Sequence, residues 1–307
     1  MKSRFAPDRG LTRRMLATIF LLGLLYVVFT AVLIVLIKSA VLAIVIAGGL
    51  LFAQYWFSDR IALYAMHGRI VTPEQAPELH GVIDRLCALA DMPKPAVAIA
   101  DVDVPNAFAT GRSPSKAVLC ATTGLMRRLE VEELEGVLAH ELSHVAHRDV
   151  AVMTVASFLG VLAGLITRFG LYAGFYGGFG DNRDGDDEGD STVLVLMAVV
   201  AVSAVVYAMS FMLTRALSRY RELSADRSGA MLTGRPSALA SALTKVSGDI
   251  ARIPTRDLRQ AEAFNAFFFA PAFAPGFSLT SLFATHPPLD RRLEQLAGLS
   301  RQLGQPV

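Results

Sequence analysis

Long apolar stretches without charged residues are the clearest feature of the chain. The stretch 15–37 carries no charge, and at about 1.5 Å of rise per residue a helix of this length crosses the roughly 30 Å hydrocarbon core of a bilayer. A second stretch, 39–58, ends near Tyr55 and Trp56, a pairing typical of a membrane interface. A cleaved signal peptide is the alternative, but its apolar core spans only roughly 7–15 residues. We therefore predict a transmembrane hairpin over residues 1–58.

Two further apolar stretches lie in the second half of the chain. The stretch 192–213 is uncharged and predicts another membrane span. The stretch 150–167 is shorter and stops at Arg168, so a buried soluble helix competes with a span there. Between them, residues 178–191 are acidic and glycine-rich, which predicts a loop exposed on the face of the membrane opposite the termini. A calcium loop is an alternative for this segment, although the full EF-hand pattern is missing.

Basic residues beside the spans indicate the orientation of the chain. Arginines and lysines are concentrated before the first span and after the fourth: Lys2, Arg4, Arg9, Arg13, Arg14, Arg215, Arg219 and Arg221. By the positive-inside rule both termini are cytoplasmic. Residues 59–149 and 214–307 then lie on the same side of the membrane, and we expect them to form one domain.

The hydrophobic pattern of residues 59–149 is that of a soluble α+β domain. Residues 73–92 follow a helical period with Pro73 and Pro77 near the start, and a second helix is expected over 131–149. Two β-type runs, 95–101 and 116–123, bracket the segment 105–111. The predicted fold class is a mainly α integral membrane protein of about four transmembrane helices, with a cytoplasmic α+β domain that contains a small β-sheet.

Composition agrees with a membrane protein and excludes some alternatives. Hydrophobic residues make up 53% of the chain and charged residues only 18%, against about 25% charged in soluble domains. The net charge of +2 and the lack of a basic stripe with aromatic residues argue against a nucleic-acid partner. Cys87 and Cys120 are the only cysteines and form no CxxC pair, so we expect free core thiols.

The helix expected over 131–149 contains the sequence HELSH, an HExxH pattern. His140 and His144 are four residues apart and lie on one helix face, so both imidazoles can reach one zinc ion. Glu141 points about 100° away and is suited to take a proton from the hydrolytic water. A chance match is the alternative, but the apolar residues on the other helix faces support a buried functional face. The pattern predicts a zinc endopeptidase with Glu141 as general base.

A catalytic zinc needs a third protein ligand, and two candidates stand out. His147 lies seven residues from His140, about 10 Å of helix rise, which is too far for the same ion. We expect it to cap the helix or pack near the membrane surface. Glu222 and Asp226 are four apart beyond the fourth span. Glu222 is the better ligand, and Asp226 is suited to accept the N–H of a histidine ligand. A solvated, arginine-paired helix start is the alternative for this pair.

Four motifs carry a family resemblance: PNAFATG, HELSHVAHRD, RELSAD and THPPLDRRL. In this order and context the chain resembles the HtpX heat-shock membrane proteases, relatives of the CAAX prenyl proteases. The resemblance implies a zincin-like metalloprotease domain with one Zn²⁺ per chain, held by His140, His144 and Glu222. It also implies that Asn106 and His286 flank the metal and act as oxyanion donors. Leu223 departs from the pattern, because related sequences often carry an aromatic residue there.

The expected function is cleavage of misfolded or damaged membrane proteins in membrane quality control and stress response. The expected location is the bacterial inner membrane, with a multi-pass chain and a cytoplasmic active site. Expected partners are membrane protein substrates, the lipid bilayer and other quality-control proteases. The phenylalanine-rich segment 263–277 either borders the cleft, enters the membrane or completes the core.

Two other functions remain open on the sequence. One is an intramembrane site-2-type protease, although Glu130, Glu132, Glu133 and Glu135 precede the HExxH pattern and argue against a membrane location for it. The other is a non-enzymatic scaffold or holdase, which would keep a closed structural metal site.

Overall fold

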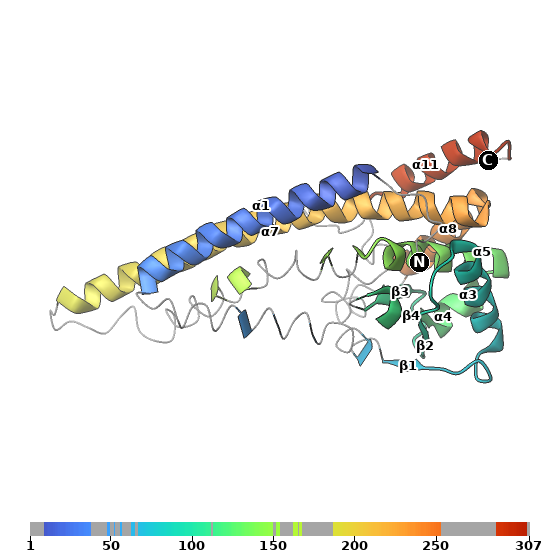
Figure 1. Cartoon of the computed structure of the whole chain (residues 1–307), viewed down its shortest axis with the longest axis horizontal. Helices are drawn as coiled ribbons and strands as arrows, with labels where there is room; N and C mark the ends of the chain where they lie inside the picture. The colour runs from blue at the N-terminus through green and yellow to red at the C-terminus, as the bar shows by residue number, and fades with distance from the viewer. Residues whose placement is uncertain are drawn as a thin grey trace. The chain divides into compact units, whose positions relative to one another are not determined.

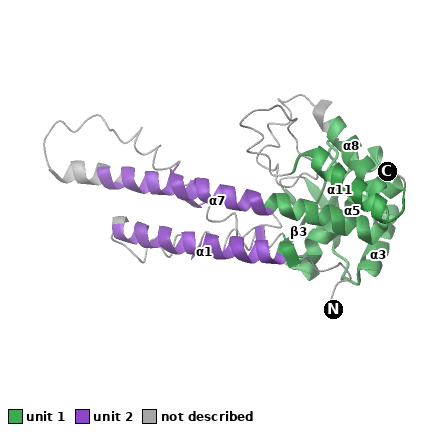
Figure 2. Ribbon diagram, turned by 90° about the horizontal axis from the view of Figure 1, so that it is seen from above, with its two compact units in different colours: residues 1–11, 57–151, 218–307 green, residues 12–56, 152–217 purple. Residues whose placement is uncertain are grey.

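The computed structural model describes most of the chain in two compact units. Unit 1 comprises residues 1–11, 57–151 and 218–307, and unit 2 comprises residues 12–56 and 152–217 (Figure 2). The described residues within these ranges are 9–37, 48–49, 52, 56, 63–64, 67–111, 113–149, 152–153, 162–164, 166–167, 187–252 and 287–305. The N-terminal apolar stretch forms helix α1 (Arg9–Ile37), and the last apolar stretch lies within the long helix α7 (Asp187–Thr233).

A four-stranded mixed sheet lies in unit 1 (Figure 1). Its strands are β1 (Gly68–Ile70), β2 (Ala96–Ala100), β3 (Ala107–Thr110) and β4 (Val118–Thr122), in the order β1-β2-β4-β3. The central strands β2 and β4 are parallel, and each edge strand pairs antiparallel with its neighbour. Strand β3 lies at an edge of the sheet and pairs with β4.

Helices complete unit 1 on both sides of one central helix, α5 (Val131–Ala146). The other helices are α3 (Pro77–Ala90), the 3-10 turn η1 (Pro114–Lys116), α4 (Thr123–Arg128), α8 (Pro236–Arg252) and α11 (Leu289–Gln302). One core joins α3 and the sheet to the Leu138 and Leu142 side of α5. A second core joins α8 and α11 to Val137 of α5. Because α5 is packed on both sides, its polar face is held in a fixed position.

The N-terminal end of α5 is tied to α8 by a buried carboxylate. The Glu133 side chain accepts the backbone N–H of Glu130 at 2.9 Å, which satisfies one of the free donors at the helix start. The same carboxylate accepts the Ser241 hydroxyl at 2.6 Å and pairs with Lys245 at 2.7 Å. These contacts fix where α5 begins relative to α8.

Unit 2 contains α1 from Thr12 onward and the first part of α7, and these two helices lie side by side (Figure 2). A small buried cluster joins them, including Phe29, Leu33 and Val206. Their outer faces are apolar and exposed: Phe20 is 70% and Met212 is 68% exposed. Within the part of the chain that the structure describes, two helices are long and apolar enough to cross a membrane, over Arg9–Val35 and Met197–Thr233. Large exposed apolar faces on such helices are what a lipid environment requires.

Several predicted elements are found in the structure, and others needed correction. The predicted helices at 73–92 and 131–149 correspond to α3 and α5, and the predicted strands correspond to β2 and β4. The segment 105–111, expected only to connect these strands, contains the third strand β3. Residues 187–190, expected in the acidic loop, form the first turn of α7.

Other predictions fall outside the described part of the chain. The second predicted span, 39–58, and the third, 150–167, lie largely there, as do residues 178–186 and the phenylalanine-rich segment 263–277. The mostly helical fold with a small sheet is confirmed, while the number of four membrane spans stays a prediction. The division of the chain at residues 58, 149 and 213 also stays a prediction.

Candidate metal centre

Helix α5 carries the three buried polar side chains that define the HExxH pattern: His140, Glu141 and His144. His140 is fully buried, and Glu141 and His144 are each 5% exposed. Buried polar groups need partners, because burial without hydrogen bonds or charge pairing is strongly unfavourable. Their partners come from α7, from β3 and from the turn after α5.

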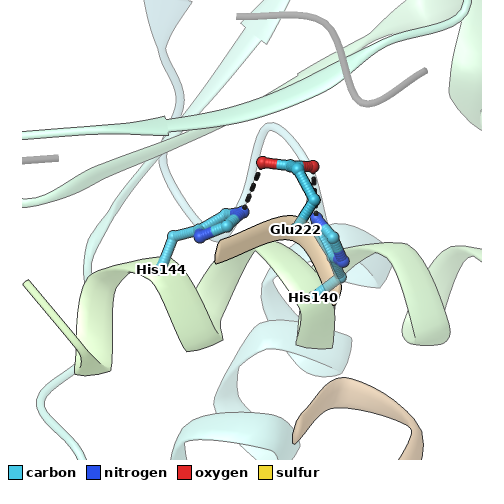
Figure 3. A group of neighbouring side chains, drawn as sticks. All are labelled: His140, His144 and Glu222. Carbon is cyan, nitrogen blue, oxygen red and sulfur yellow. Dashed lines mark ion pairs between the residues drawn. The ribbon is translucent and has the colours of Figure 1, made fainter. Parts of the chain in front are cut away.

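The third member of the cluster is Glu222 on α7. One ligand atom each from His140, His144 and Glu222 lies within 4.8 Å of the other two. Nε2 of His140 is 3.5 Å from Oε2 of Glu222, and Nε2 of His144 is 3.5 Å from Oε1 (Figure 3). The two imidazole rings lie nearly perpendicular, with their centres 4.9 Å apart. Both Nε2 atoms therefore face the same carboxylate.

The geometry of these three residues fits a tetrahedral metal ion. Ligand atoms held at about 2.0–2.1 Å from such an ion lie about 3.3 Å from one another. Each Nε2 lies 3.5 Å from one of the two carboxylate oxygens of Glu222, His140 from Oε2 and His144 from Oε1, and both separations come close to this value. Two imidazoles and one carboxylate are also a donor set used by catalytic zinc sites, which leave a fourth position for water or substrate.

Each histidine is oriented by a second carboxylate at its other ring nitrogen. Nδ1 of His140 is 2.9 Å from Oδ1 of Asp226 on α7. Nδ1 of His144 is 2.8 Å from Oδ2 of Asp149, which follows α5. A carboxylate at Nδ1 fixes the tautomer that leaves Nε2 free to bind a metal.

The charges buried around the cluster favour a divalent cation. Four buried carboxylates lie in or beside it, and two arginines pair with two of them, Arg221 with Asp149 and Arg292 with Asp226; the other two carboxylates are those of Glu141 and Glu222. With neutral imidazoles and all four carboxylates ionised, this set has two negative charges in excess. A divalent cation would neutralise that excess in a region of low dielectric constant.

The pKa values of the histidines follow from these surroundings. Burial lowers the pKa of His140, but Asp226 and Glu222 outweigh the burial and raise it to about 9. Burial lowers the pKa of His144 below its ordinary value, with Asp149 acting in the opposite direction. When no metal is bound, a proton on His140 would supply part of the positive charge that these carboxylates favour.

The side chain of Glu141 extends from α5 to strand β3. Its Oε2 accepts the backbone N–H of Ala109 at 3.1 Å. Burial raises the pKa of Glu141 to about 7, although His140 lowers it in part. A carboxyl group with a pKa near neutrality is well matched to general acid and base chemistry.

Three further residues were considered from the sequence: Asn106 and His286 as oxyanion donors, and His147 as a rejected ligand. Asn106 is fully buried before β3, and its backbone N–H donates to the Thr122 hydroxyl at 2.9 Å. His286 lies outside the described residues. His147 is the C-cap of α5, and its Nδ1 lies 2.8 Å from the carbonyl oxygen of Ser143. It is not part of the three-residue ligand cluster.

Sequence reasoning missed four contributors to this site: Ala109, Asp149, Arg221 and Arg292. Arg292 donates to both carboxylate oxygens of Asp226, at 2.7 and 2.6 Å, and is 1% exposed. An arginine in THPPLDRRL gives no signal of burial, because arginines are mostly exposed. A backbone N–H such as that of Ala109 carries no sequence signal at all.

Comparison with known proteins shows the family of the chain. The model of peptidase family M48 matches residues 73–300. Protease HtpX homolog 1 of Streptomyces coelicolor is 65% identical over 305 residues, covering 99% of this chain and 98% of that protein. The protease HtpX homolog of Moorella thermoacetica is 52% identical over 303 residues, covering 99% of both chains. The resemblance stated from the motifs is thereby confirmed.

A solved structure supports the fold alone. The crystal structure of S. mikatae Ste24p matches with a TM-score of 0.52 at 18% identity, covering 92% of this chain and 64% of that one. The family match covers most of the chain, and the HtpX homologues extend over nearly all of it. The chain therefore belongs to peptidase family M48, as a membrane-anchored metalloprotease similar to the HtpX proteases.

Proposed function

We propose that this chain is a zinc-dependent endopeptidase that cleaves misfolded or damaged membrane proteins at the cytoplasmic face of the bacterial inner membrane. One observation carries the chemical part of the proposal: His140, His144 and Glu222 present three ligand atoms within 4.8 Å of one another, beside the buried carboxyl group of Glu141. The ligand set contains nitrogen and carboxylate oxygen but no thiolate, and this favours a catalytic over a structural zinc ion.

The proposed mechanism divides the work among the residues of the site. Zinc bound by the three ligands, one ion per chain, would polarise the attacking water and the scissile carbonyl. Glu141 takes a proton from that water on its carboxylate and later passes it to the leaving amine. The Ala109 N–H bonded to Oε2 holds this carboxylate in place. Asp226 keeps the His140 ring oriented for metal binding.

Asn106 and His286 are proposed as donors to the oxyanion that forms during attack, on the basis of the motif resemblance. Removal of one such donor typically lowers kcat by about 10²–10³. We therefore expect Asn106→Ala and His286→Ala each to lower kcat while zinc content stays at one ion per chain. An unchanged kcat in either variant would remove that residue from the mechanism.

The proposed location rests on charge and hydrophobicity. Basic residues precede the apolar part of α1 and follow that of α7, which favours a cytoplasmic site by the positive-inside rule. Helix α5 lies outside both candidate spans among the described residues. It also begins with the acidic residues Glu132 and Glu133. These features favour a membrane-anchored protease over the site-2-type alternative.

A test of the proposal compares two substitutions in the full chain, reconstituted in lipid vesicles. Glu141→Ala should abolish cleavage of an unfolded protein substrate while zinc content stays at one ion per chain. Glu222→Ala should lower both zinc content and cleavage, because it removes a ligand. Full cleavage by Glu141→Ala, or a wild-type protein that binds no zinc, would refute the mechanism. Zinc binding without any cleavage would favour the scaffold alternative.

A further inference from the structure

The contact between His144 and Asp149 depends on an unusual turn at the end of α5. Five residues along a regular helix correspond to a rotation of about 500°, which would place Asp149 roughly 140° around the helix from His144. The helix instead ends at Ala146, and Arg148 has a positive φ of 58°. This left-handed residue reverses the chain and returns Asp149 to within 2.8 Å of His144.

A left-handed conformation is unfavourable for a residue with a side chain. Glycine is the usual residue at such a position after a helix, because it has no Cβ to clash with the backbone. Arginine gives no such advantage, so surrounding contacts must stabilise the conformation. The buried contact of Asp149 with His144 is one such contact, since Asp149 is 1% exposed.

Arg221 provides the next contact outward from the metal cluster. Its Nε lies 3.2 Å from Oδ2 of Asp149, and its Nη2 lies 3.4 Å from Nδ1 of His144. A guanidinium has only donors, so it cannot hydrogen-bond an Nδ1 that itself carries a hydrogen. When Nε2 faces a metal, Nδ1 carries that hydrogen and donates it to Asp149. Arg221 then pairs with the Asp149 carboxylate and holds it against Nδ1, which orients the His144 ring.

The two histidines are thus supported by similar chains of contacts. His140 contacts Asp226, which in turn pairs with Arg292. His144 contacts Asp149, which in turn pairs with Arg221. The pair of Arg292 with Asp226 has two hydrogen bonds and is almost fully buried. The Arg221 side chain is 11% exposed, and its contact with Asp149 is longer, at 3.2 Å. Arg221 also directly precedes Glu222 on α7.

We propose that Asp149 and Arg221 are positioning residues for His144, and that the left-handed turn at Arg148 exists to bring Asp149 to Nδ1. In this arrangement α7 provides Glu222 to the metal and, one residue earlier, the arginine that holds the carboxylate behind His144. The inference rests on the proposed zinc site and adds residues that set how tightly the site holds its ion.

The test measures zinc affinity of the purified full chain by competition with a chromophoric chelator, without using proteolysis. Loss of a carboxylate behind a metal-bound histidine typically weakens metal binding by about 10–100-fold. We expect Asp149→Ala to weaken zinc binding within that range. Asp149→Asn keeps an acceptor oxygen for Nδ1–H, so its affinity should lie between those of the wild type and Asp149→Ala. Arg221→Lys should retain more affinity than Arg221→Leu.

Cobalt substitution supplies a spectroscopic readout that a general loss of stability would not change. The visible absorption of bound Co²⁺ depends on its ligand geometry, so we expect altered bands in Asp149→Ala and wild-type bands in the control Asp103→Asn. Asp103 is a suitable control because it pairs with Arg127 on the surface. Unchanged Co²⁺ bands together with unchanged zinc affinity in Asp149→Ala would overturn the inference.

Backbone substitutions test the turn separately from the side chains. Arg148→Gly should keep zinc affinity within about threefold of wild type, because glycine adopts a positive φ without strain. Arg148→Val should weaken it by at least about fivefold, since a β-branched residue disfavours this conformation. Equal zinc affinity in the two variants would remove the turn from the proposal.

Failure of the inference can be distinguished from failure of the proposed function. A wild-type chain that binds no zinc refutes the zinc site itself. If the wild type binds zinc and both Asp149→Ala and Arg221→Leu bind it equally tightly, only the positioning roles are refuted. Circular dichroism of the metal-free variants identifies any that do not fold, and Asp149→Asn, which preserves size and shape, then decides the outcome.

Discussion

The buried carboxyl group of Glu141 determines the pH dependence expected of catalysis. Burial raises its pKa to about 7 in the metal-free site, and a nearby metal cation would lower that value. Only the ionised form accepts a proton, so kcat/KM should fall as the pH decreases below this pKa. We expect an acidic limb at or below pH 7 in a pH–rate profile of the zinc-loaded chain.

The same profile identifies the group that titrates. Glu141→Gln should lower kcat by about 10²–10⁴, the usual contribution of a general base, and abolish the acidic limb. His147→Ala serves as a matched control, because His147 lies beside the pattern but outside the ligand cluster. An acidic limb that persists at the same pH in Glu141→Gln would assign it to another group.

His140 makes metal binding compete with protonation. Its pKa of about 9 in the metal-free site lies above the ordinary value of about 6.5. Stability from this protonation is therefore fully present below about pH 6.5 and is lost as the pH rises through 9. Because zinc must displace the proton, zinc affinity should rise by up to about tenfold per pH unit over this range.

Competition titrations at pH 6.5, 7.5 and 8.5 measure this dependence, with thermal unfolding of the metal-free chain as a second readout. Asp226→Asn removes a carboxylate that raises the His140 pKa, so its zinc affinity should depend less steeply on pH. A wild-type zinc affinity that does not change between pH 6.5 and 8.5 would contradict the assigned protonation.

At the residue scale, spacing along a helix was the most informative signal. It placed His140 and His144 on one face and paired Glu222 with Asp226, and the structure brings these side chains into one cluster. Asp149 could not be found in this way, because its position depends on the positive φ of Arg148. The sequence contains no glycine or asparagine there to signal such a turn.

At the element scale, the close approach of α7 to α5 depends on Gly229. A Cβ atom on this residue would lie 2.8 Å from the backbone nitrogen of His140 and 3.2 Å from the carbonyl carbon of Ala139. Backbone atoms of a packed helix cannot move aside easily, so α7 itself would have to shift. Glu222 and Asp226 lie on the same helix as Gly229, and such a shift would move them away from the histidines.

We predict that Gly229→Ala lowers the free energy of unfolding by about 1–3 kcal/mol, the usual cost of overpacking, and weakens zinc binding about tenfold. Gly248→Ala on α8 is the matched control, because no atom lies within 4 Å of its added Cβ. Alanine in an open helical position should stabilise the chain by about 0.5–1 kcal/mol. Denaturant titration and zinc competition measure both effects, and wild-type zinc affinity in Gly229→Ala would contradict the prediction.

Elements were predicted well where the hydrophobic pattern was long and poorly where it was short. Helices α3 and α5 show a clear helical period, and β2 and β4 are apolar runs. Strand β3 has four residues that are all buried, so it lacks the alternation that identifies a strand with one exposed face. Helix α7 continues past the apolar stretch to Thr233, and the division of the chain at residue 213 stays a prediction.

At the scale of the whole molecule, the proposed topology can be tested by labelling introduced cysteines, because the two native thiols are expected to be unreactive. Burial raises the pKa of Cys87 to about 11 and that of Cys120 to about 12. Both thiols are free and buried, so neither should react with a maleimide near pH 7. A single introduced cysteine then reports only its own exposure.

We expect Lys116→Cys, at an exposed position in unit 1, to react with a membrane-impermeant maleimide in inside-out vesicles but not in spheroplasts. Asn182→Cys, in the acidic segment predicted on the opposite face, should show the reverse pattern. Labelling of Lys116→Cys in intact spheroplasts would place the protease domain outside and contradict the cytoplasmic assignment. The wild-type chain, treated in parallel, controls for reaction at Cys87 and Cys120.

Helix α7 also has a consequence for how the protein is made. The ribosome synthesises the HExxH pattern first and Glu222 only after the long apolar part of α7, which belongs to the same uninterrupted helix. A nascent chain that has not yet produced this helix holds two of the three ligands and neither Arg221 nor Asp226. A newly made chain therefore cannot complete the proposed metal site until α7 has been synthesised through Glu222.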